Sequence, residues 1–237
     1  PSGPLGKAHE LGYQVNDLKA RVIVAAADLL PVVEQVRPAS ALQHVFVVHY
    51  ADWLPASPTI ALPAELIAAR ETPRLVPAGF DTVRRTDARP TPVDLSLDDV
   101  ALMTYTSGTT GLPKGAMLSL GNALFKTQVT AQSAGIGAGD VALSVAPLYH
   151  IAGMLMGVNV PILAGATQVL LFRFDPLAVL QAIDRCKVTH WYSIAPMNVA
   201  CMQVAQPERY DLRSLRRNPV TSFGITFTEA LAQQWQA

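Results

Sequence analysis

Residues Thr106–Gly115 read TSGTTGLPKG and follow directly on the apolar stretch Val100–Tyr105, VALMTY. The apolar stretch has the length of a buried strand. The decapeptide after it contains three glycines, four hydroxyl side chains and Lys114. Glycines let a backbone approach a ligand closely, while successive amides and a lysine attract an anion. We therefore predict a phosphate-binding loop at the edge of an α/β sheet, where such sheets bind ligands.

Other motifs with a glycine-rich turn do not match this sequence. A Walker A loop has a glycine directly before its lysine and Ser or Thr after it. Here Pro113 precedes Lys114 and Gly115 follows it. A dinucleotide loop needs G-x-G-x-x-G after a strand, and the glycines of residues 135–139 are spaced differently. The hydrolase pattern G-x-S-x-G is absent.

Strand and helix patterns alternate along the chain. We expect strands at residues 21–25, 44–48, 100–105, 141–145, 167–172, 188–192 and 220–223, and helices at residues 9–16, 29–36, 64–70, 120–133, 151–164, 176–185, 197–205 and 228–234. Asp28 and Ser119 are suited to cap the helices that follow them. This alternation predicts an α/β fold with a parallel, doubly wound sheet covered by helices.

Residues 50–92 are rich in proline and weakly periodic. Apart from the helix at residues 64–70, we expect surface loop there. This stretch therefore separates two α/β portions. The first comprises residues 1–92, including the proline-rich loop, and the second comprises residues 93–237 with the phosphate-binding loop.

The composition narrows the possible partners. Among 237 residues, Lys plus Arg and Asp plus Glu each number 18, so no basic excess indicates a nucleic-acid partner. Cys186 and Cys201 form no disulfide framework, and residues 1–6 do not resemble a signal peptide, so we expect a cytoplasmic location. Because no Met opens the chain, we expect that it starts inside a longer protein.

Residues 141–172 contain no Asp, Glu, Lys or Arg. Their length would suit a membrane span, but prolines and glycines interrupt them. We interpret them as a strand, a helix and a strand buried in an α/β core, and we expect no integral membrane span. Peripheral contact with a membrane stays open, although no amphipathic basic helix indicates it.

Three segments resemble one known superfamily. Tyr105–Gly115 (YTSGTTGLPKG) resembles the signature of adenylate-forming enzymes, which include acyl-CoA synthetases, aryl-CoA ligases, luciferases and peptide-synthetase adenylation domains. Pro147–His150 (PLYH) resembles their second motif, and His9–Asp17 (HELGYQVND) resembles the early part of long-chain acyl-CoA synthetases. The resemblance covers essentially the whole chain and implies the large N-terminal domain of that superfamily.

The resemblance implies a reaction in two steps. A carboxylate attacks the α-phosphate of ATP and gives an acyl-adenylate and pyrophosphate. The thiol of coenzyme A then attacks the acyl carbon and releases AMP. Mg²⁺ bridges phosphate oxygens in the first step, so the chemistry consists mainly of positioning and charge neutralisation.

The resemblance also implies which residues of the loop bind ATP. The residues expected to cradle its phosphates are Thr106, Ser107, Gly108, Thr109, Thr110, Gly111 and Lys114. Thr109 is further expected beside the magnesium ion.

Other site residues follow from the same resemblance. His150 is expected near the carboxylate and the acyl tunnel; the alternative is a buried histidine bonded in the core. Arg173 is expected close to the nucleotide of coenzyme A, or else is a solvated charge at a strand end. Gly224 is the glycine retained where the family has an adenine-contacting segment. His190 has no such context, so we expect a structural role.

Two apolar segments are expected to wall an acyl pocket, although ordinary core would explain them equally well. They are the helix Ile151–Ala164 and the segment Trp191–Met197.

Several family elements have no counterpart in this sequence. They are a Tyr-Gly-x-Thr-Glu segment that helps to bind magnesium, a Thr-Gly-Asp segment that binds ribose, and a small C-terminal domain with a lysine. We therefore expect a truncated large domain that has negligible ligase activity alone. Faces that are normally covered would then be exposed, so we also expect a homodimer or aggregate.

The leading hypothesis is a fatty acyl-CoA ligase whose substrates are a fatty acid, ATP and coenzyme A. An aryl-CoA ligase or a peptide-synthetase adenylation domain is the alternative within the superfamily. A non-catalytic module that binds nucleotide or a protein partner is the alternative from another class.

Overall fold

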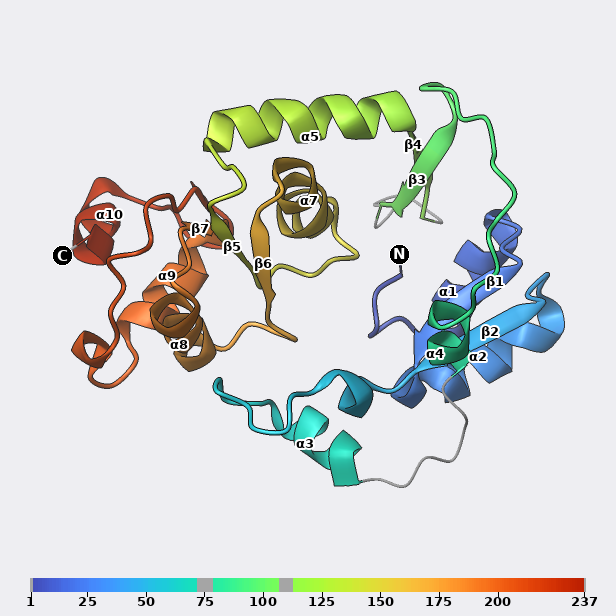
Figure 1. The fold of residues 1–237 in the computed structure, drawn as a ribbon, viewed down its shortest axis with the longest axis horizontal. Coiled ribbons are helices and arrows are strands. Elements are labelled where there is room, and N and C mark those ends of the chain that lie inside the picture. The colour runs from blue at the N-terminus through green and yellow to red at the C-terminus, as the bar shows by residue number, and fades with distance from the viewer. Residues whose placement is uncertain (1, 72–78, 107–112, 237) are drawn as a thin grey trace. The chain divides into compact units, whose positions relative to one another are not determined.

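The computed structural model describes residues 2–71, 79–106 and 113–236. The chain divides into two compact units (Figure 1). Unit 1 comprises residues 1–58 and 62–95, and unit 2 comprises residues 59–61 and 96–237. Within the described residues, no helix combines the length and the apolar run that crossing a bilayer requires.

Unit 1 is built on a pair of parallel strands with two helices packed together. Its first elements are α1 (Ala8–Asp17), β1 (Val22–Ala26), α2 (Leu30–Val36) and β2 (His44–Val48). Buried apolar side chains from these elements and the turn between them form a core: Val15, Ala25, Val33, Val36 and Leu42. Both strands and the first helix lie where the sequence predicted them. The predicted cap at Asp28 is wrong, because a 3₁₀ turn (Ala27–Leu29) contains this residue and α2 begins after it.

The proline-rich stretch is more ordered than the sequence indicated. The expected helix is present as α3 (Ala64–Glu71). A 3₁₀ turn (Tyr50–Trp53) and a second helix, α4 (Gly79–Arg84), stand where loop was expected. Helix α4 packs on β2, and a methyl group on Gly79 would contact the Phe46 ring at 3.6 Å. Packing on the strand, which periodicity does not report, therefore stabilises this short helix.

Unit 2 opens with a β-hairpin followed by a long helix. Strands β3 (Val100–Tyr105) and β4 (Gly115–Ser119) are antiparallel, and α5 (Leu120–Ala134) follows at once. The Asn122 N–H donates to Ser119 Oγ and the Ser119 N–H donates to Asn122 Oδ1, both at 3.2 Å. This reciprocal cap confirms the predicted start of α5. Strand β4 was not predicted, since a helix was expected to follow the loop directly.

The other strands of unit 2 form parallel pairs. They are β5 (Val141–Ser144), β6 (Thr167–Leu170), β7 (His190–Trp191), β8 (Ser193–Ile194) and β9 (Val220–Thr221). The order is β6-β5-β7 in one sheet and β8-β9 in the other. Only Tyr192 separates β7 from β8, and the Trp191 N–H donates to the Arg217 carbonyl at 3.0 Å. The two sheets therefore continue one another as a parallel layer, as the sequence predicted.

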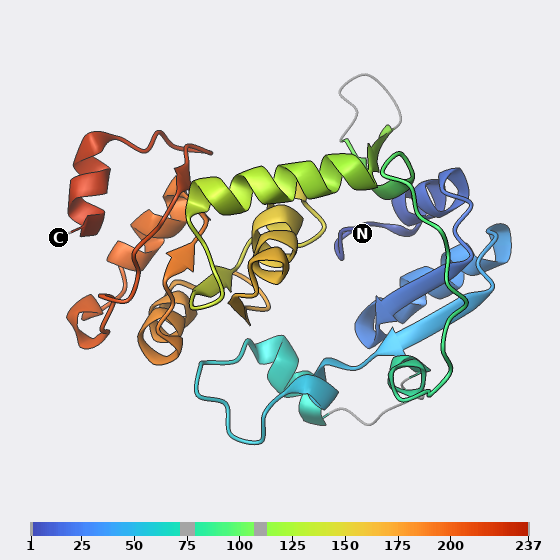
Figure 2. The same ribbon diagram turned by 45° about the horizontal axis from the view of Figure 1, so that its top comes forward.

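Helices cover this layer on both faces (Figure 2). After β5 one helical run contains α6 (Ile151–Met154), a π turn (Leu155–Asn159) and α7 (Val160–Ala164), and α7 packs on α5. Helices α8 (Pro176–Cys186) and α9 (Ala195–Met202) pack together on the opposite face, and α10 (Glu229–Gln236) contacts α9. The chain thus runs from β5 to β6 on one side and then to β7 on the other. Ligands of open α/β sheets bind where the strand order reverses in this way.

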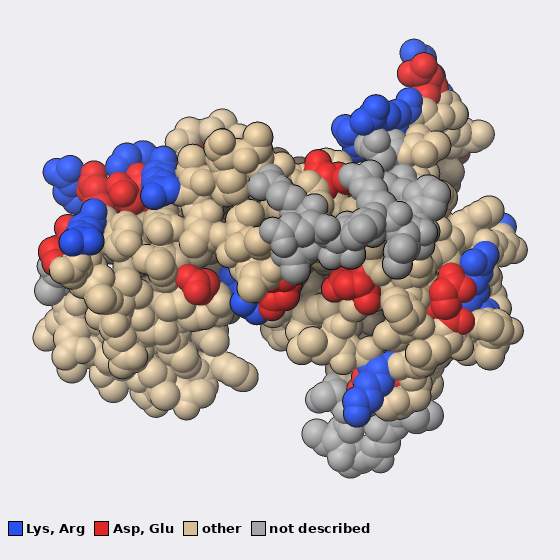
Figure 3. All heavy atoms as spheres, turned by 90° about the horizontal axis from the view of Figure 1, so that it is seen from below, with Lys and Arg blue, Asp and Glu red and all other residues tan. Residues whose placement is uncertain are grey.

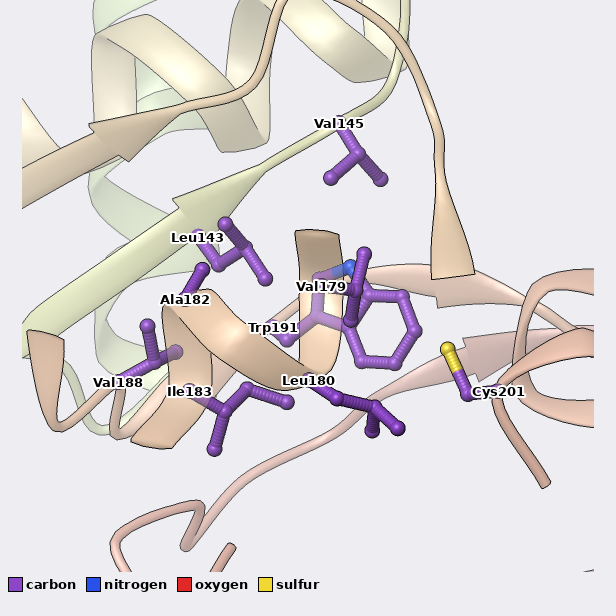
Figure 4. Close-up of a cluster of buried hydrophobic side chains, with 9 residues drawn as sticks. All are labelled: Leu143, Val145, Val179, Leu180, Ala182, Ile183, Val188, Trp191 and Cys201. Atoms are coloured by element: carbon purple, nitrogen blue, oxygen red, sulfur yellow. The ribbon is translucent and has the colours of Figure 1, made fainter. Parts of the chain in front are cut away.

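The main core lies between β5, β7, α8 and α9. Figure 4 shows Trp191 at its centre, between Leu143 of β5, Val145 directly after this strand, and the apolar side chains of α8. Trp191, Val179 and Ile183 are fully buried. This core fixes the strands whose ends carry the candidate site residues. On the face drawn in Figure 3, acidic and basic side chains lie in mixed groups, in keeping with their equal numbers.

Candidate functional site

The β3–β4 hairpin carries the glycine-rich loop. The Thr106 N–H donates to the Lys114 carbonyl at 3.0 Å, which closes the hairpin around residues 107–112. Five predicted phosphate ligands lie outside the described residues: Ser107, Gly108, Thr109, Thr110 and Gly111. Thr106 and Lys114 are described, and both side chains are exposed. Within the described ranges, no acidic side chain pairs with Lys114, so its ammonium group is available to an anion.

A side chain at the start of β4 would crowd the ring of Tyr105. Tyr105 and Gly115 are directly paired in the hairpin. A methyl group on Gly115 would stand 3.1–3.4 Å from three atoms at the end of the Tyr105 ring. The ring therefore lies over the backbone directly after Lys114, where a larger residue would displace it.

His150 lies in the segment that follows β5 and caps the helical run that comes next. Its N–H donates to the Pro147 carbonyl at 3.0 Å, and its Nδ1 accepts from the Ala152 N–H at 3.2 Å. The cap requires an unprotonated Nδ1, so the neutral ring carries its proton on Nε2. The side chain is exposed, which excludes the alternative of a buried core histidine.

Two other predicted site residues also follow parallel strands. Arg173 is exposed and comes shortly after β6, directly before Phe174 and Asp175, whose carboxylate caps α8 by accepting from the Ala178 N–H at 2.8 Å. Gly224 follows β9 with a φ of 76°. This left-handed conformation suits glycine.

The parallel pairing brings these three residues to one edge of the layer. Strands β5 and β6 are parallel, as are β5 and β7, and β8 and β9. Because His150, Arg173 and Gly224 each follow the carboxyl end of such a strand, they lie at the edge where open α/β sheets bind ligands. Helix α5 packs against the hairpin and against α7, so it connects the loop-bearing hairpin to the same layer.

A small apolar pocket lies on the α5 and α7 side of the sheet. Its lining includes Met156 of the π turn, Val160 of α7, Ala142 of β5, and Trp191 and Tyr192. The structure thus brings together the two segments that the sequence analysis linked to an acyl pocket.

A buried polar network lies at the opposite, amino end of the strands. Asp140 accepts from the Gly137 N–H at 2.9 Å and from Thr189 Oγ1 at 3.0 Å, and it also pairs with Arg216. Burial alone would raise the pKa of Asp140. The two hydrogen bonds and the charges of His190 and Arg216 instead hold it below its ordinary value.

His190 belongs to this network and not to the candidate site. Its Nδ1 lies 2.9 Å from Thr189 Oγ1, and its Nε2 lies 3.2 Å from the Ala134 carbonyl oxygen. The His190 side chain is buried. His190 is the first residue of β7, so it lies at the edge of the parallel layer away from His150. The expected structural role agrees with this position.

Cys201 is a core side chain. Burial, with a smaller contribution from Asp175, raises the pKa of its thiol to about 12. A thiol with this pKa is protonated at neutral pH and is a poor nucleophile. Cys201 therefore offers no covalent chemistry.

Sequence reasoning missed a polar cluster near Gly224. Hydrogen bonds join Ser193 of β8, Asn198 of α9 and Asn218, which directly precedes Pro219. No motif marks them, and only the sequence position of Asn198 inside an otherwise apolar helix could have drawn attention to it. Among the described residues, no group of three or more His, Cys, Asp or Glu side chains is arranged to hold a metal ion.

The candidate residues lie at one edge of a parallel α/β layer, and α5 connects this layer to the hairpin that carries the glycine-rich loop. These features are typical of the class of α/β nucleotide-binding proteins. Within this class the chain belongs to the family described as AMP-binding enzyme, whose family model matches residues 1–237. The family resemblance and the fold predicted from the sequence are thereby confirmed.

Individual relatives agree with this family. A long-chain-fatty-acid–CoA ligase from Bacillus subtilis is 28% identical over 91% of this chain. A feruloyl-CoA synthase from Amycolatopsis is 38% identical over 65% of this chain. The chain spans 40% and 31% of the length of these two relatives. The crystal structure of ATP-bound MatB from Rhodopseudomonas palustris shares the fold, with a TM-score of 0.71 and 21% identity over all of this chain and 41% of that chain.

Proposed function

We propose that this chain is the ATP-binding part of an acid–thiol ligase that releases AMP. A carboxylate oxygen attacks the α-phosphorus of ATP, and the bond to pyrophosphate breaks. The sulfur of coenzyme A then attacks the acyl carbon, AMP leaves, and the thiol proton passes to solvent. Membership of the AMP-binding family and the ATP-bound and CoA-ligase relatives support this reaction.

The closed hairpin is the observation that carries the proposal. The bond between Thr106 and Lys114 draws both ends of the glycine-rich loop together, with the Lys114 ammonium exposed beside them. Clustered amides, hydroxyls and a lysine suit a polyphosphate. In the proposed site, Lys114, Thr106 and the residues between them hold the β- and γ-phosphates. Magnesium, bound to phosphate oxygens beside Thr109, would neutralise their charge.

The carboxyl edge of the parallel layer supplies the remaining groups. His150, with Nδ1 committed to the Ala152 N–H, presents Nε2–H near the reacting carboxylate. Exposed apolar side chains flank it, namely Leu148, Tyr149 and Ile151. Gly224 lets the backbone approach adenine, and Arg173 lies near the nucleotide of coenzyme A.

We propose a fatty acid as the carboxylate. The Bacillus relative supports this choice, while the feruloyl-CoA synthase supports an aromatic acid. Carboxylate-dependent exchange of pyrophosphate into ATP, measured across fatty, aromatic and amino acids in the enzyme that carries this chain, decides between them. Exchange with fatty acids alone supports the proposal. Exchange only with aromatic or amino acids replaces the substrate, and ATP binding without exchange favours a non-catalytic nucleotide-binding module.

We also propose that the chain self-associates. Helix α5 exposes an apolar group, with Leu124 at 45%, Phe125 at 70% and Val129 at 43% relative exposure. Apolar groups of this kind favour association. Light scattering of the 237-residue chain tests this, and a monodisperse monomer at all concentrations contradicts it.

A further inference from the structure

Three polar side chains form a closed ring of hydrogen bonds in unit 2. Ser193 Oγ donates to Asn198 Oδ1 at 2.6 Å, Asn198 Nδ2 donates to Asn218 Oδ1 at 2.7 Å, and Asn218 Nδ2 donates to Ser193 Oγ at 2.9 Å. Ser193 and Asn198 are 1% and 0% exposed. Asn218 is partly exposed. Each member donates and accepts within the ring, so neither of the two buried side chains is left unpaired.

The ring joins three separate elements. Ser193 belongs to β8, Asn198 belongs to α9, and Asn218 stands directly before Pro219 and β9. Asn218 Nδ2 also donates to the Trp191 carbonyl at 2.6 Å. Apolar side chains could fill the same space without any directional requirement. A buried polar ring instead specifies one geometry, so we assign this ring to the placement of the chain that follows Asn218.

The chain after Asn218 leads directly to Gly224 and is attached again along its way. The hydroxyls of Tyr192 and Thr221 lie 2.9 Å apart, and the Ser193 N–H donates to the Pro219 carbonyl at 3.1 Å. A methyl group on Gly224 would meet Pro196 Cγ at 3.6 Å. Residues 218–221 are therefore attached to β8 and the residues beside it, and Gly224 follows three residues later, close to Pro196.

We propose that Asn198 and Asn218 are positioning residues for nucleotide binding. They hold residues 218–224 so that the left-handed turn at Gly224 presents its backbone to the adenine of ATP. This inference rests on the proposed function, and it adds two residues that the resemblance to the family does not name. Neither residue touches the reacting atoms, so their effect should appear in ATP binding and not in carboxylate binding.

The test is Asn218→Ala in the enzyme that carries this chain, with pyrophosphate exchange as the assay. We expect the KM for ATP to rise about tenfold, while the KM for the carboxylate stays within about twofold. The matched control is Thr189→Val, which breaks the buried network at the amino end of the same strands. It should lower thermal stability as well but leave both KM values unchanged.

Tyr192→Phe is a second variant, and it leaves the buried side chains of the ring unchanged. It removes only the bond between the Tyr192 and Thr221 hydroxyls, which is exposed, and we expect a smaller rise in the KM for ATP, about threefold. If the alanine variant does not fold, this measurement decides alone. Unchanged KM for ATP in the folded variants, or equal changes in the Thr189 control, overturns the inference. Absence of exchange in the unaltered enzyme would instead contradict the proposed function.

Discussion

A methyl group on Gly157 would overlap Oγ of Ser144 and stand 2.9 Å from its Cβ. The π turn therefore lies with its backbone directly on β5, and only glycine fits. Gly153 repeats this relationship one turn earlier, where a methyl group would overlap the Pro147 carbonyl. Together the two glycines hold the helical run against β5 and the segment that connects this strand to His150.

Gly157→Ala should lower the free energy of unfolding by about 1–3 kcal/mol, because overpacking a close contact forces the backbone apart. Gly137→Ala is the matched control, because no atom lies within 4 Å of its added methyl group. It should change stability by no more than about 0.5 kcal/mol. Urea unfolding of both variants measures the difference, and equal effects would show that the contact with Ser144 is not tight.

Much of this fold follows from local sequence patterns. The strands β1, β2 and β5 and the helices α5 and α8 stand where apolar periodicity and capping residues predicted them. Strand β4 escaped prediction because its partner β3 lies across the loop, and pairing of this kind is not a local property. The π turn escaped because it depends on the contact between Gly157 and Ser144, and periodicity predicts only a helix.

Part of the candidate site could also be predicted from the sequence, and part could not. The motif predicted where Thr106, Lys114 and His150 stand in the sequence, but only the structure gives the exposure of His150 and its bond to Ala152. The ring of Ser193, Asn198 and Asn218 could not be predicted, because its members are distant in sequence and resemble no motif. Their roles in binding stay predictions.

Substitutions of His150 should separate its contribution to stability from its contribution to activity. His150→Asn keeps a side chain able to accept from the Ala152 N–H, so stability should stay within about 0.5 kcal/mol, whereas His150→Ala should lose about 1 kcal/mol. Both variants lack the imidazole and should lower kcat/KM for the carboxylate about tenfold or more. Thermal unfolding and the exchange assay measure the two effects. Full activity of the asparagine variant would show that His150 acts only as a helix cap.

Asp140 should make stability depend on acid pH. Its folded pKa is below the ordinary value, so its contribution is complete above the unfolded pKa and is lost as pH falls through the folded pKa. Asp140→Asn should cost about 2 kcal/mol at pH 7, and the difference should shrink below about pH 4. Urea midpoints across pH test this. A difference that persists unchanged at pH 2 would exclude the ionised carboxylate as its cause.

Lys114 should strengthen ATP binding because of its position in the hairpin, and not only because of its positive charge. Lys114→Ala should weaken ATP binding roughly ten- to hundredfold, because a charge-assisted contact to phosphate is lost. Lys126→Ala removes the same charge from an exposed position on α5 and should change affinity less than about twofold. Calorimetric titration of the two variants makes the comparison. Similar losses in both would indicate only a general electrostatic effect.

The nucleotide product distinguishes an AMP-forming ligase from other enzymes that use ATP. The enzyme that carries this chain is incubated with ATP, magnesium, coenzyme A and a fatty acid, and the products are separated and quantified. We expect AMP and pyrophosphate in equal amounts with acyl-CoA, all dependent on the acid. Formation of ADP and phosphate, or nucleotide turnover that does not require the acid, would contradict it.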